Sequence, residues 1–256
     1  AGNTVAMNPS SAVPIGALVV VWCAWDGTGA AAPAEDLISV VDNVGNVYTN
    51  IGGREHSTIT GGYLHICKLT RALATTDTIT ARYNTGASIT AKAISAWRFS
   101  VDGNWAYRAR ETAISGAADP AAITLGALET GATYLWLHLL SSEGPGDDAF
   151  TWDADYTQIS TFGTTGAGPT TNQTVLGGFR IFEGTSDTVD VTSDTADRSH
   201  TQVLVAVREF TPTSTFPNTP LRDAFTRADE APLDGAGLWD NTVPLPPSPT
   251  TSFLAL

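Results

Sequence analysis

Residues 78–83, Thr-Ile-Thr-Ala-Arg-Tyr, and residues 88–94, Ser-Ile-Thr-Ala-Lys-Ala-Ile, decide the fold class of this chain. In both stretches apolar and polar side chains alternate, which places one face of a strand in a core and the other face in water. Half-buried strands of this kind are typical of antiparallel sheets. Both stretches therefore predict antiparallel β-structure.

Other strand patterns surround these two at short intervals. Residues 18–21, 135–140 and 203–207 are apolar on both faces, as expected for central strands that are covered on each side. Helical pattern is scarce, because Gly, Pro and β-branched residues interrupt all but two short turns, at 34–36 and 71–75. Strands are predicted at 15–25, 37–41, 46–51, 63–69, 78–83, 88–99, 123–128, 134–140, 178–183, 189–192 and 202–210.

These strands predict one all-β module over residues 1–210, an antiparallel jelly-roll-like β-sandwich. It is longer than an immunoglobulin domain of about 100 residues, and neither a linker-like break nor a fixed-period repeat is visible within it. Residues 211–220, TPTSTFPNTP, form a Pro/Thr linker. The 36 residues at 221–256 are too few to bury a core of their own, so they predict a C-terminal arm or an incomplete second sandwich.

The composition excludes two classes of partner. The chain has 256 residues, of which 13 are basic and 26 acidic, and its formal net charge of -13 repels a phosphate backbone. Its most apolar stretch, residues 17–25, is too short to span a bilayer and has no basic region before it, unlike a signal peptide. The sequence thus predicts neither nucleic-acid binding nor membrane insertion.

The cysteines and histidines indicate no metal chemistry. Cys23 and Cys67 both lie in strand patterns, and they could form a disulfide if these strands are neighbours, buried free thiols being the alternative. The histidines lie far apart, without the spacing of a zinc site, and are expected to be strand or loop residues with ordinary hydrogen bonds. They are His56, His65, His138 and His200.

Two acidic segments are candidate cation sites. Five carboxylates between residues 143 and 155 could supply the oxygen ligands of calcium, but their spacing matches no EF-hand loop, and a solvated polar loop is the alternative. They are Glu143, Asp147, Asp148, Asp153 and Asp155. Residues 42–46, Asp-Asn-Val-Gly-Asn, could hold a cation or form a hairpin turn, which needs the same residue types. We predict no metal site and no cofactor.

No catalytic residue is predicted either. Serine nucleophile elbows, phosphate-binding glycine loops and the H-E-x-x-H pattern are all lacking in the sequence. A pair of carboxylates for glycoside hydrolysis needs only to be close in space, and nothing in the sequence selects one. We therefore predict that the protein is not an enzyme.

The aromatic residues supply the candidate contact sites. Trp22, Trp97 and Trp136 lie in strand patterns and are expected in the core. The loops at 141–153 and 163–172 are expected to be exposed tips, where recognition residues concentrate. Two pairs of aromatics outside the strand patterns could stack on a sugar or contact a partner. These pairs are Trp105 with Tyr107, and Trp152 with Tyr156.

One segment resembles a known type of module. Residues 37–49, Leu-Ile-Ser-Val-Val-Asp-Asn-Val-Gly-Asn-Val-Tyr-Thr, are similar to the V-x-D-x-x-G-N-x-[YW]-T strand-turn-strand of β-sandwich modules in bacteriophage and bacterial surface proteins. In that pattern a G-x-L-V-V-V strand precedes it, here residues 16–21, and an apolar and aromatic strand follows, here residues 63–69. The order of segments matches over most of residues 15–210.

A second resemblance covers the C-terminal segment. Residues 221–239, with the run Leu-Arg-Asp-Ala-Phe-Thr-Arg-Ala-Asp-Glu-Ala-Pro-Leu-Asp-Gly and then Trp239, resemble the D-x-F-[NT]-R-A-[DN]-x-x-P-L-G…W opening of concanavalin-like sandwich modules. Such openings occur in minor tail proteins and fibres of phages. The residues of this segment expected to form an assembly arm are Phe225, Arg227, Leu233 and Trp239.

Together the resemblances imply a bacteriophage virion structural protein of the minor-tail, tail-fibre or decoration type. They imply a location on the tail or capsid surface of the extracellular particle. The expected partners are other virion proteins, copies of the chain itself and, as a further role, a host cell-surface glycan. The alternative is a carbohydrate-binding module of a secreted or surface protein, which requires exposed and coplanar Trp105 and Trp152.

Overall fold

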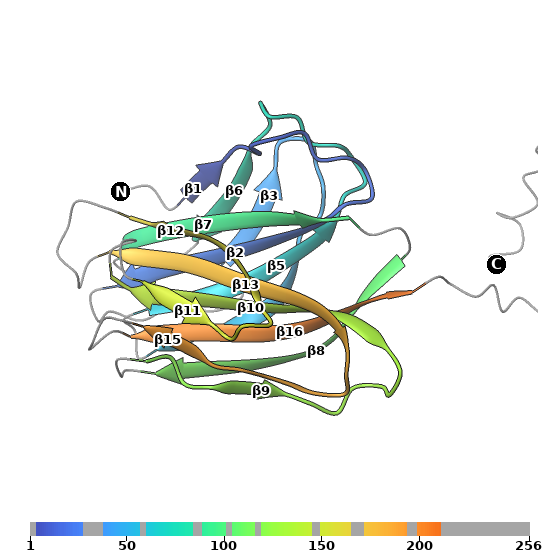
Figure 1. Ribbon diagram of the computed structural model, residues 1–256. Helices are drawn as coiled ribbons and strands as arrows, with labels where there is room; N and C mark the ends of the chain where they lie inside the picture. Colours follow the sequence, from blue (N-terminus) through green and yellow to red (C-terminus); the bar gives the residue numbers. More distant parts are fainter. Residues whose placement is uncertain are drawn as a thin grey trace, which may run out of the picture. The chain divides into compact units, whose positions relative to one another are not determined.

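The computed structural model describes nine stretches of the chain, all of which lie within residues 1–212 (Figure 1). The linker at 211–220 and the arm at 221–256, with Phe225, Arg227, Leu233 and Trp239, lie outside the described residues and stay predictions. The described stretches are 4–27, 38–56, 60–83, 89–100, 104–115, 119–144, 149–164, 172–193 and 199–210. Within them, no helix has the length and apolarity that crossing a membrane requires.

All regular secondary structure in these stretches is β-strand, and every pairing of strands is antiparallel. The predicted antiparallel all-β fold is therefore confirmed. The strands are β1 (Thr4–Met7), β2 (Leu18–Gly27), β3 (Ile38–Asp42), β4 (Thr49–His56), β5 (Thr60–Lys68), β6 (Ile79–Tyr83), β7 (Ile89–Phe99), β8 (Asn104–Ser115), β9 (Ile123–Leu125), β10 (Thr133–Glu143), β11 (Phe150–Trp152), β12 (Thr157–Gly163), β13 (Gln173–Glu183), β14 (Asp187–Val189), β15 (Val191–Ser193) and β16 (His200–Phe210).

The strands stack in four layers with an apolar core between each layer and the next (Figure 1). The first layer is the sheet β1-β6-β3, the second is β4-β5-β2-β7 and the third is β12-β13-β10-β16-β8. Two short pairs, β11-β15 and β14-β9, form the fourth layer. The jelly-roll detail of the prediction is not confirmed, because a jelly roll has eight strands in two sheets.

The three stretches that are apolar on both faces lie in the middle of this stack, as predicted. They form β2, β10 and β16, each of which has a neighbouring strand on both sides. Alternate residues of β2 point into different cores: Val19 and Val21 into the core under the first layer, and Val20 and Trp22 into the core between the second and third layers. Burial on both faces explains the unbroken apolar sequence.

The chain contains an internal repeat of strand order. Strands β1 to β5 correspond to β9 to β13 in the same order, β6 corresponds to β14 and β15 together, and β7 corresponds to β16. Under this correspondence β4-β5-β2-β7 becomes β12-β13-β10-β16, and β1-β6-β3 becomes β9-β14 with β15-β11. We call β1–β7 the first half and β9–β16 the second half.

The sequence keeps few traces of this repeat. One is a Gly-Ala pair that enters the long central strand of each half, Gly16-Ala17 before β2 and Gly131-Ala132 before β10. Both glycines have a positive φ, 86° and 75°, which only glycine adopts without strain, and both alanines are buried. Such isolated matches do not produce a visible fixed period.

The two halves pack on each other as two equivalent subunits would. β5 contacts β16 in the way that β13 contacts β7, and β2 contacts β13 in the way that β10 contacts β5. Reciprocal contacts of this kind are what a two-fold axis between equivalent units produces. The core between the second and third layers is thus the interface between the two halves, which pack as the two subunits of a symmetric dimer do.

β8 has no counterpart among the described strands. It follows β7 in the chain but joins the sheet of the second half, where it pairs with β16 from Asn104 opposite Phe210 to Ser115 opposite His200. The sequence did not predict this strand, because charged residues interrupt its apolar pattern. β8 links the end of the first half to the sheet edge of the second.

Glycine pairs make room for large aromatic side chains in both halves. A Cβ atom added to Gly61 or Gly62 on β5 would lie 2.1 Å from the ring of Trp25 or Trp22, respectively. On β13, a Cβ atom on Gly178 would lie 2.7 Å from Nε1 of Trp152. The aromatic rings lie against bare backbone, which is a packing role for glycine within a strand.

The two cysteines are free and buried. Their strands are neighbours, which was the condition for a disulfide, but the register separates them: Cys67 lies opposite Val19, and Cys23 lies opposite Tyr63. Four residues along a strand amount to about 13 Å, well beyond the reach of a disulfide. The alternative of two buried thiols is therefore the one that the structure shows.

The predicted strand positions agree with the structure for most of the chain, and the differences lie in both halves and in β8. Besides β8, the short strands β1, β11 and β12 were not predicted. The expected exposed tip at 141–153 is wrong for several strand residues: Ser141 and Ser142 are buried in β10, and Phe150 and Trp152 are buried in β11, whereas Ala149, Thr151 and Asp153 are exposed. The turn at 71–75 is not helical.

Candidate functional site

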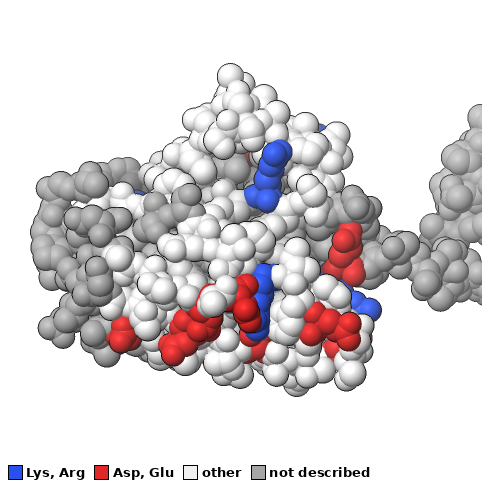
Figure 2. Space-filling view, viewed as in Figure 1, with Lys and Arg blue, Asp and Glu red and all other residues white. Residues whose placement is uncertain are grey.

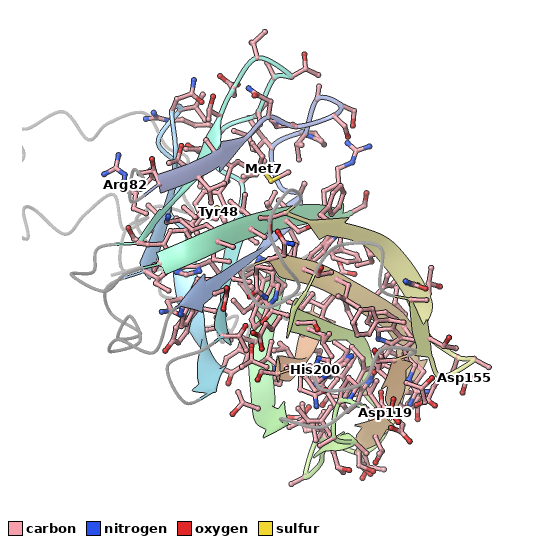
Figure 3. The ribbon with its side chains drawn as sticks, turned by 90° about the vertical axis from the view of Figure 1, so that its left-hand side faces the viewer. Met7, Tyr48, Arg82, Asp119, Asp155 and His200 are labelled. Atoms are coloured by element: carbon pink, nitrogen blue, oxygen red, sulfur yellow. The ribbon has the colours of Figure 1, made fainter. Side chains whose placement is uncertain are left out.

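Buried polar side chains gather at one end of the interface between the halves. Figure 3 looks at the molecule from this side, with His200 labelled inside the second half and Asp155 at its periphery. The group comes from the ends of β2 and β10 and the beginnings of β5, β13 and β16. We call it the polar seam; it consists of Asp26, Thr60, Ser141, Ser142, Asn172, Gln173, Thr174, Ser199, His200, Thr201 and Gln202.

Hydrogen bonds of the polar seam connect the two halves. The hydroxyl of Thr60, on β5, lies 2.9 Å from Oε1 of Gln173, on β13. The hydroxyl of Ser141, on β10, lies 3.4 Å from the carbonyl oxygen of Gly61 and 2.5 Å from the hydroxyl of Thr201. Because buried polar groups are costly without partners, these bonds favour one register of the two sheets.

His138 lies between the polar seam and the outer layer of the second half. The indole Nε1–H of Trp152 donates to its Nδ1 at 3.0 Å, so its proton is on Nε2, which lies 2.7 Å from Oε1 of Gln202. Burial lowers the pKa of His138 to about 4, despite the opposing effects of Gln202 and Asp153. The imidazole is thus neutral at pH 7 and both its nitrogens are bonded, which confirms the predicted structural role.

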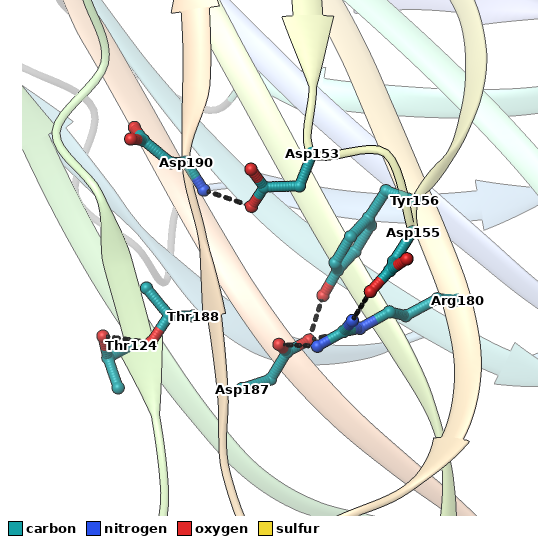
Figure 4. A network of polar contacts seen from close by, with 8 residues as sticks. All are labelled: Thr124, Asp153, Asp155, Tyr156, Arg180, Asp187, Thr188 and Asp190. Carbon is teal, nitrogen blue, oxygen red and sulfur yellow. Dashed lines mark hydrogen bonds and ion pairs between the residues drawn. The ribbon is translucent and has the colours of Figure 1, made fainter.

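A second polar cluster lies on the outer side of the second half (Figure 4). Arg180, on β13, binds Asp187, on β14, with two guanidinium nitrogens, and the bond from Nε to Oδ2 is 2.9 Å long. The hydroxyl of Tyr156 donates to the same carboxylate at 2.5 Å, and Asp155 pairs with Arg180 at 3.2 Å. The cluster joins the third layer to the fourth.

The charges in this cluster compensate each other. The side chain of Asp187 is 1% exposed and that of Arg180 is 19% exposed, whereas Asp155 is 78% exposed. Burial alone would lower the pKa of Arg180, but the hydrogen bonds and charge of Asp187 raise it above its usual value. Burial and the bond to Asp187 raise the pKa of Tyr156. Arg180 also lies over the rings of Tyr156 and Phe182, at 5.1 Å and 4.0 Å from their centroids.

In the first half, Asp42 closes the turn that follows β3. Its Oδ1 accepts the backbone N–H groups of Val44, Gly45 and Asn46, at 3.2, 2.7 and 2.9 Å. Its Oδ2 accepts Nδ2 of Asn46 at 2.8 Å and the hydroxyl of Tyr48 at 3.1 Å. With both oxygens bonded in this way, residues 42–46 form a turn, which agrees with the turn alternative; it is not a regular hairpin, because β3 and β4 lie in different sheets and a single bridge, Val41 to Val47, closes it.

The four predicted contact aromatics do not form one surface. Trp152 and Tyr156 are each 7% exposed and belong to the core under the fourth layer, so the prediction that they form an exposed platform is wrong. Their burial follows from β11, which covers the third layer, a role that three residues of sequence do not reveal. Trp105 and Tyr107 are half-buried on β8, where both pack against the core between the halves.

The predicted acidic site is not assembled among the described residues. Asp153 accepts the backbone N–H of Asp190 at 3.0 Å, Asp155 pairs with Arg180, and Asp147 and Asp148 lie outside the described residues. Within the described stretches, no group of three or more His, Cys, Asp or Glu residues could hold a metal ion. Figure 2 shows acidic side chains gathered over the second half, and few over the first.

Two features of the site were not predicted from the sequence. The polar seam combines residues that lie far apart in the chain, and the Arg180 cluster depends on a packing layer of three-residue strands. The only sequence signal for the cluster is Asp187-Thr188, which matches Asp77-Thr78 in the other half. Comparisons with protein-family models, with curated proteins and with solved structures find no match to this chain.

Proposed function

We propose that the protein is a non-enzymatic structural component of a tailed-phage virion, of the minor-tail, fibre or decoration type. The observation that carries this proposal is the use of its reactive side chains. The side chains of His138, Asp42 and the pair Arg180 with Asp187 all form hydrogen bonds to other residues of the fold. Side chains that are bonded within the fold in this way suit a protein that keeps a fixed shape within an assembly. The resemblances of residues 37–49 and 221–239 favour the same role.

The test is whether the protein is part of a particle. Tailed phages from the source of the sequence are purified, their proteins are identified by mass spectrometry, and antibodies against residues 1–210 locate the chain by electron microscopy. We expect the protein on the tail or the capsid surface. Intact particles from which it is missing would refute the proposal.

Carbohydrate binding is the second candidate, and one observation favours it. Trp105 and Tyr107 are two residues apart, so they lie on the same face of β8, and both are partly exposed at the sheet edge. Stacking on sugar rings uses such aromatic faces. This candidate now depends on β8 alone, since Trp152 and Tyr156 are buried.

Glycan arrays probed with the full chain test the second candidate. A specific glycan signal that Trp105→Ala and Tyr107→Ala remove would support it. Ile181→Ala is a matched control, because Ile181 is also apolar and is 65% exposed on a different strand. A signal that the control removes equally, or the lack of any signal, would count against carbohydrate binding.

A further inference from the structure

We propose that the free edge of β7 accepts residues 221–231 of a second copy of the chain as an added antiparallel strand. The inference rests on the proposed assembly function and names the contact through which copies join. It concerns a described edge and a segment that lies outside the described residues.

β7 is paired along one side only. It pairs with β2 from Ile89 opposite Gly27 to Phe99 opposite Leu18, and among the described residues no strand pairs with its other side. Its counterpart β16 is covered at that side by β8. An open strand of 11 residues presents a row of backbone donors and acceptors, which is a template for another strand.

The surroundings of β7 match those of its counterpart β16, which contacts β9 and β4. β8 contacts β9 and β4 as well as β16. The counterparts of β9 and β4 are β1 and β12, and both of these contact β7. A strand added to β7 would therefore be the two-fold mate of β8. It would begin opposite Phe99, as β8 begins at Asn104 opposite Phe210, and would run antiparallel to β7.

The chain after β16 contains a segment of suitable length. In the first half the chain leaves β7 and becomes β8, so the corresponding segment of the second half is the one that follows β16. Its first ten residues contain Pro212, Pro217 and Pro220, which do not suit a paired strand. The next proline is Pro232, and the proline-free residues 221–231 are as long as β7.

The charges of the two segments are complementary in one register. Lys92 and Arg98 lie six residues apart on one face of β7, and Asp223 and Asp229 have the same spacing in the tail. Antiparallel pairing that places Asp223 opposite Arg98 also places Asp229 opposite Lys92. Arg98 is exposed, and its Nη1 donates to the carbonyl oxygen of Ala12 at 2.8 Å, which leaves its other nitrogens for a carboxylate.

The same register gives the aromatic residue of the segment a place to pack. Phe225 falls opposite Ala96, which borders the core under the first layer. On the opposite face the segment carries Ala224, Thr226 and Ala228, side chains small enough to lie at the rim of the interface between the halves. Backbone pairing, two ion pairs and the packing of Phe225 are thus compatible with one alignment, in which Arg227 lies opposite Ile94.

The length of the linker favours a second copy as the donor. Four residues, 100–103, carry the chain from β7 to β8. Ten residues with three prolines separate Phe210 from Leu221, and an extended Pro-rich stretch of this length spans about 31 Å. Such a spacer suits a donor that reaches a neighbour rather than its own sheet.

Cysteine cross-linking tests the pairing. Full-length Ala96→Cys and full-length Phe225→Cys are mixed and oxidised, and we expect a disulfide-linked dimer of the two variants. Phe216→Cys, within the linker, replaces Phe225→Cys in the control and should give little dimer. A cross-link that forms only when both substitutions are on one chain, and yields a monomer, would overturn the second-copy donor. No cross-link in either arrangement would overturn the β7 edge itself.

Charge reversal tests the register. Asp223→Lys with Asp229→Lys should weaken self-association in analytical ultracentrifugation by about tenfold, as expected for two exposed ion pairs, and Lys92→Asp with Arg98→Asp should restore it. Asp234→Lys with Asp240→Lys makes the same charge change beyond Pro232 and should have no effect. If the protein is found in particles and self-associates regardless of these changes, the inference fails and the proposed function stands. If it is missing from particles, the proposed function fails independently.

Discussion

The first and second halves are built from corresponding strands in the same order, yet their charges differ. Residues 1–100 carry six acidic and six basic side chains, whereas residues 101–210 carry fifteen acidic and five basic ones, a net charge of zero against -10. The features that the halves share are internal: a Gly-Ala pair before the central strand, a Gly-Gly pair in its neighbour, and the packing of the central sheets. The difference teaches that the buried positions maintain this fold while the outer surfaces are free to diverge.

We expect the largest effect on stability when glycines of the two halves are replaced by alanine. Gly61→Ala places a Cβ atom 2.1 Å from the ring of Trp25, which cannot move easily within the core. Gly177→Ala meets the end of the flexible Leu139 side chain at 2.8 Å. We expect Gly61→Ala to lower the free energy of unfolding by about 3 kcal/mol or more, and Gly177→Ala by about 1 kcal/mol. Urea denaturation measures both.

Gly126→Ala is the control for the glycine pair. Its added Cβ atom would meet only the Cβ of Ser186 at 3.6 Å, an ordinary contact. We expect a change within about 0.5 kcal/mol. Equal losses at Gly61 and Gly177 would mean that the first half is no tighter around its aromatic residues than the second.

The second effect concerns pH, since each half contains a buried histidine whose pKa is lowered. Burial lowers the pKa of His65 and of His138 to about 4, below the value of about 6.5 in an unfolded chain. Because the unfolded state binds the proton more readily, stability is lost as the pH falls from about 6.5 to 4. Each histidine should cost about 2 kcal/mol at pH 5 relative to pH 8.

Unfolding by urea over this pH range, in the wild type and in His65→Gln and His138→Gln, measures the contribution of each half. Each substitution should flatten the pH dependence by a similar amount, although each also lowers stability at pH 8. The wild-type curve serves as the reference for carboxylates that titrate in the same range. A variant with an unchanged slope would show that its histidine is protonated in the folded state as easily as in the unfolded state.

The third effect is the loss of stability when either of two aspartates at corresponding positions is replaced by asparagine. Asp187→Asn removes the charge that pairs with the mostly buried Arg180, and we expect a loss of about 2 kcal/mol at pH 7. Asp77, at the corresponding position, is half-buried and accepts the backbone N–H of Ala74 at 2.7 Å. Asp77→Asn should cost less than about 1 kcal/mol. A similar loss for both would indicate that the Arg180 cluster adds no stability to the second half.

The smallest effect concerns the contact between the halves. Thr60→Val keeps the shape of the side chain but leaves Oε1 of Gln173 without its bond across the interface. We expect a loss of about 1 kcal/mol in urea denaturation. In the double variant Thr60→Val with Gln173→Leu much of this loss should be recovered, because both partners are then apolar. A loss that grows in the double variant would show that the amide has another role.

The sequence predicted the strands whose burial repeats regularly and did not predict those that depend on their neighbours. β6 and β7 alternate cleanly, and β2, β10 and β16 are continuous apolar runs, so each carries its own signal. β8 is a strand because it pairs with the edge of β16. β11 is a strand because it packs over the third layer. Neither reason is visible in the local sequence.

The residues of the candidate site also divide into those with a sequence signal of their own and those that depend on neighbouring strands. His138 could be predicted as a structural residue from its place in an apolar strand. Trp152 looked like a loop residue, because three-residue strands leave no periodic pattern, and its burial depends on Gly178 and His138 from other strands. Arg180 has no local signal at all, since its partners Asp187 and Tyr156 are defined only by the packing of the layers.

The position of β16 also has a mechanical consequence. β16 is flanked on both sides by long antiparallel neighbours, β8 and β10, and it ends at Phe210, where the chain leaves the described part of the molecule. Tension applied there acts along the strand and loads both ladders in shear, so many hydrogen bonds must break together. At the other end, β1 has four residues and pairs only with β6. A protein stretched between these ends should therefore yield first at β1 and keep its second half folded under load.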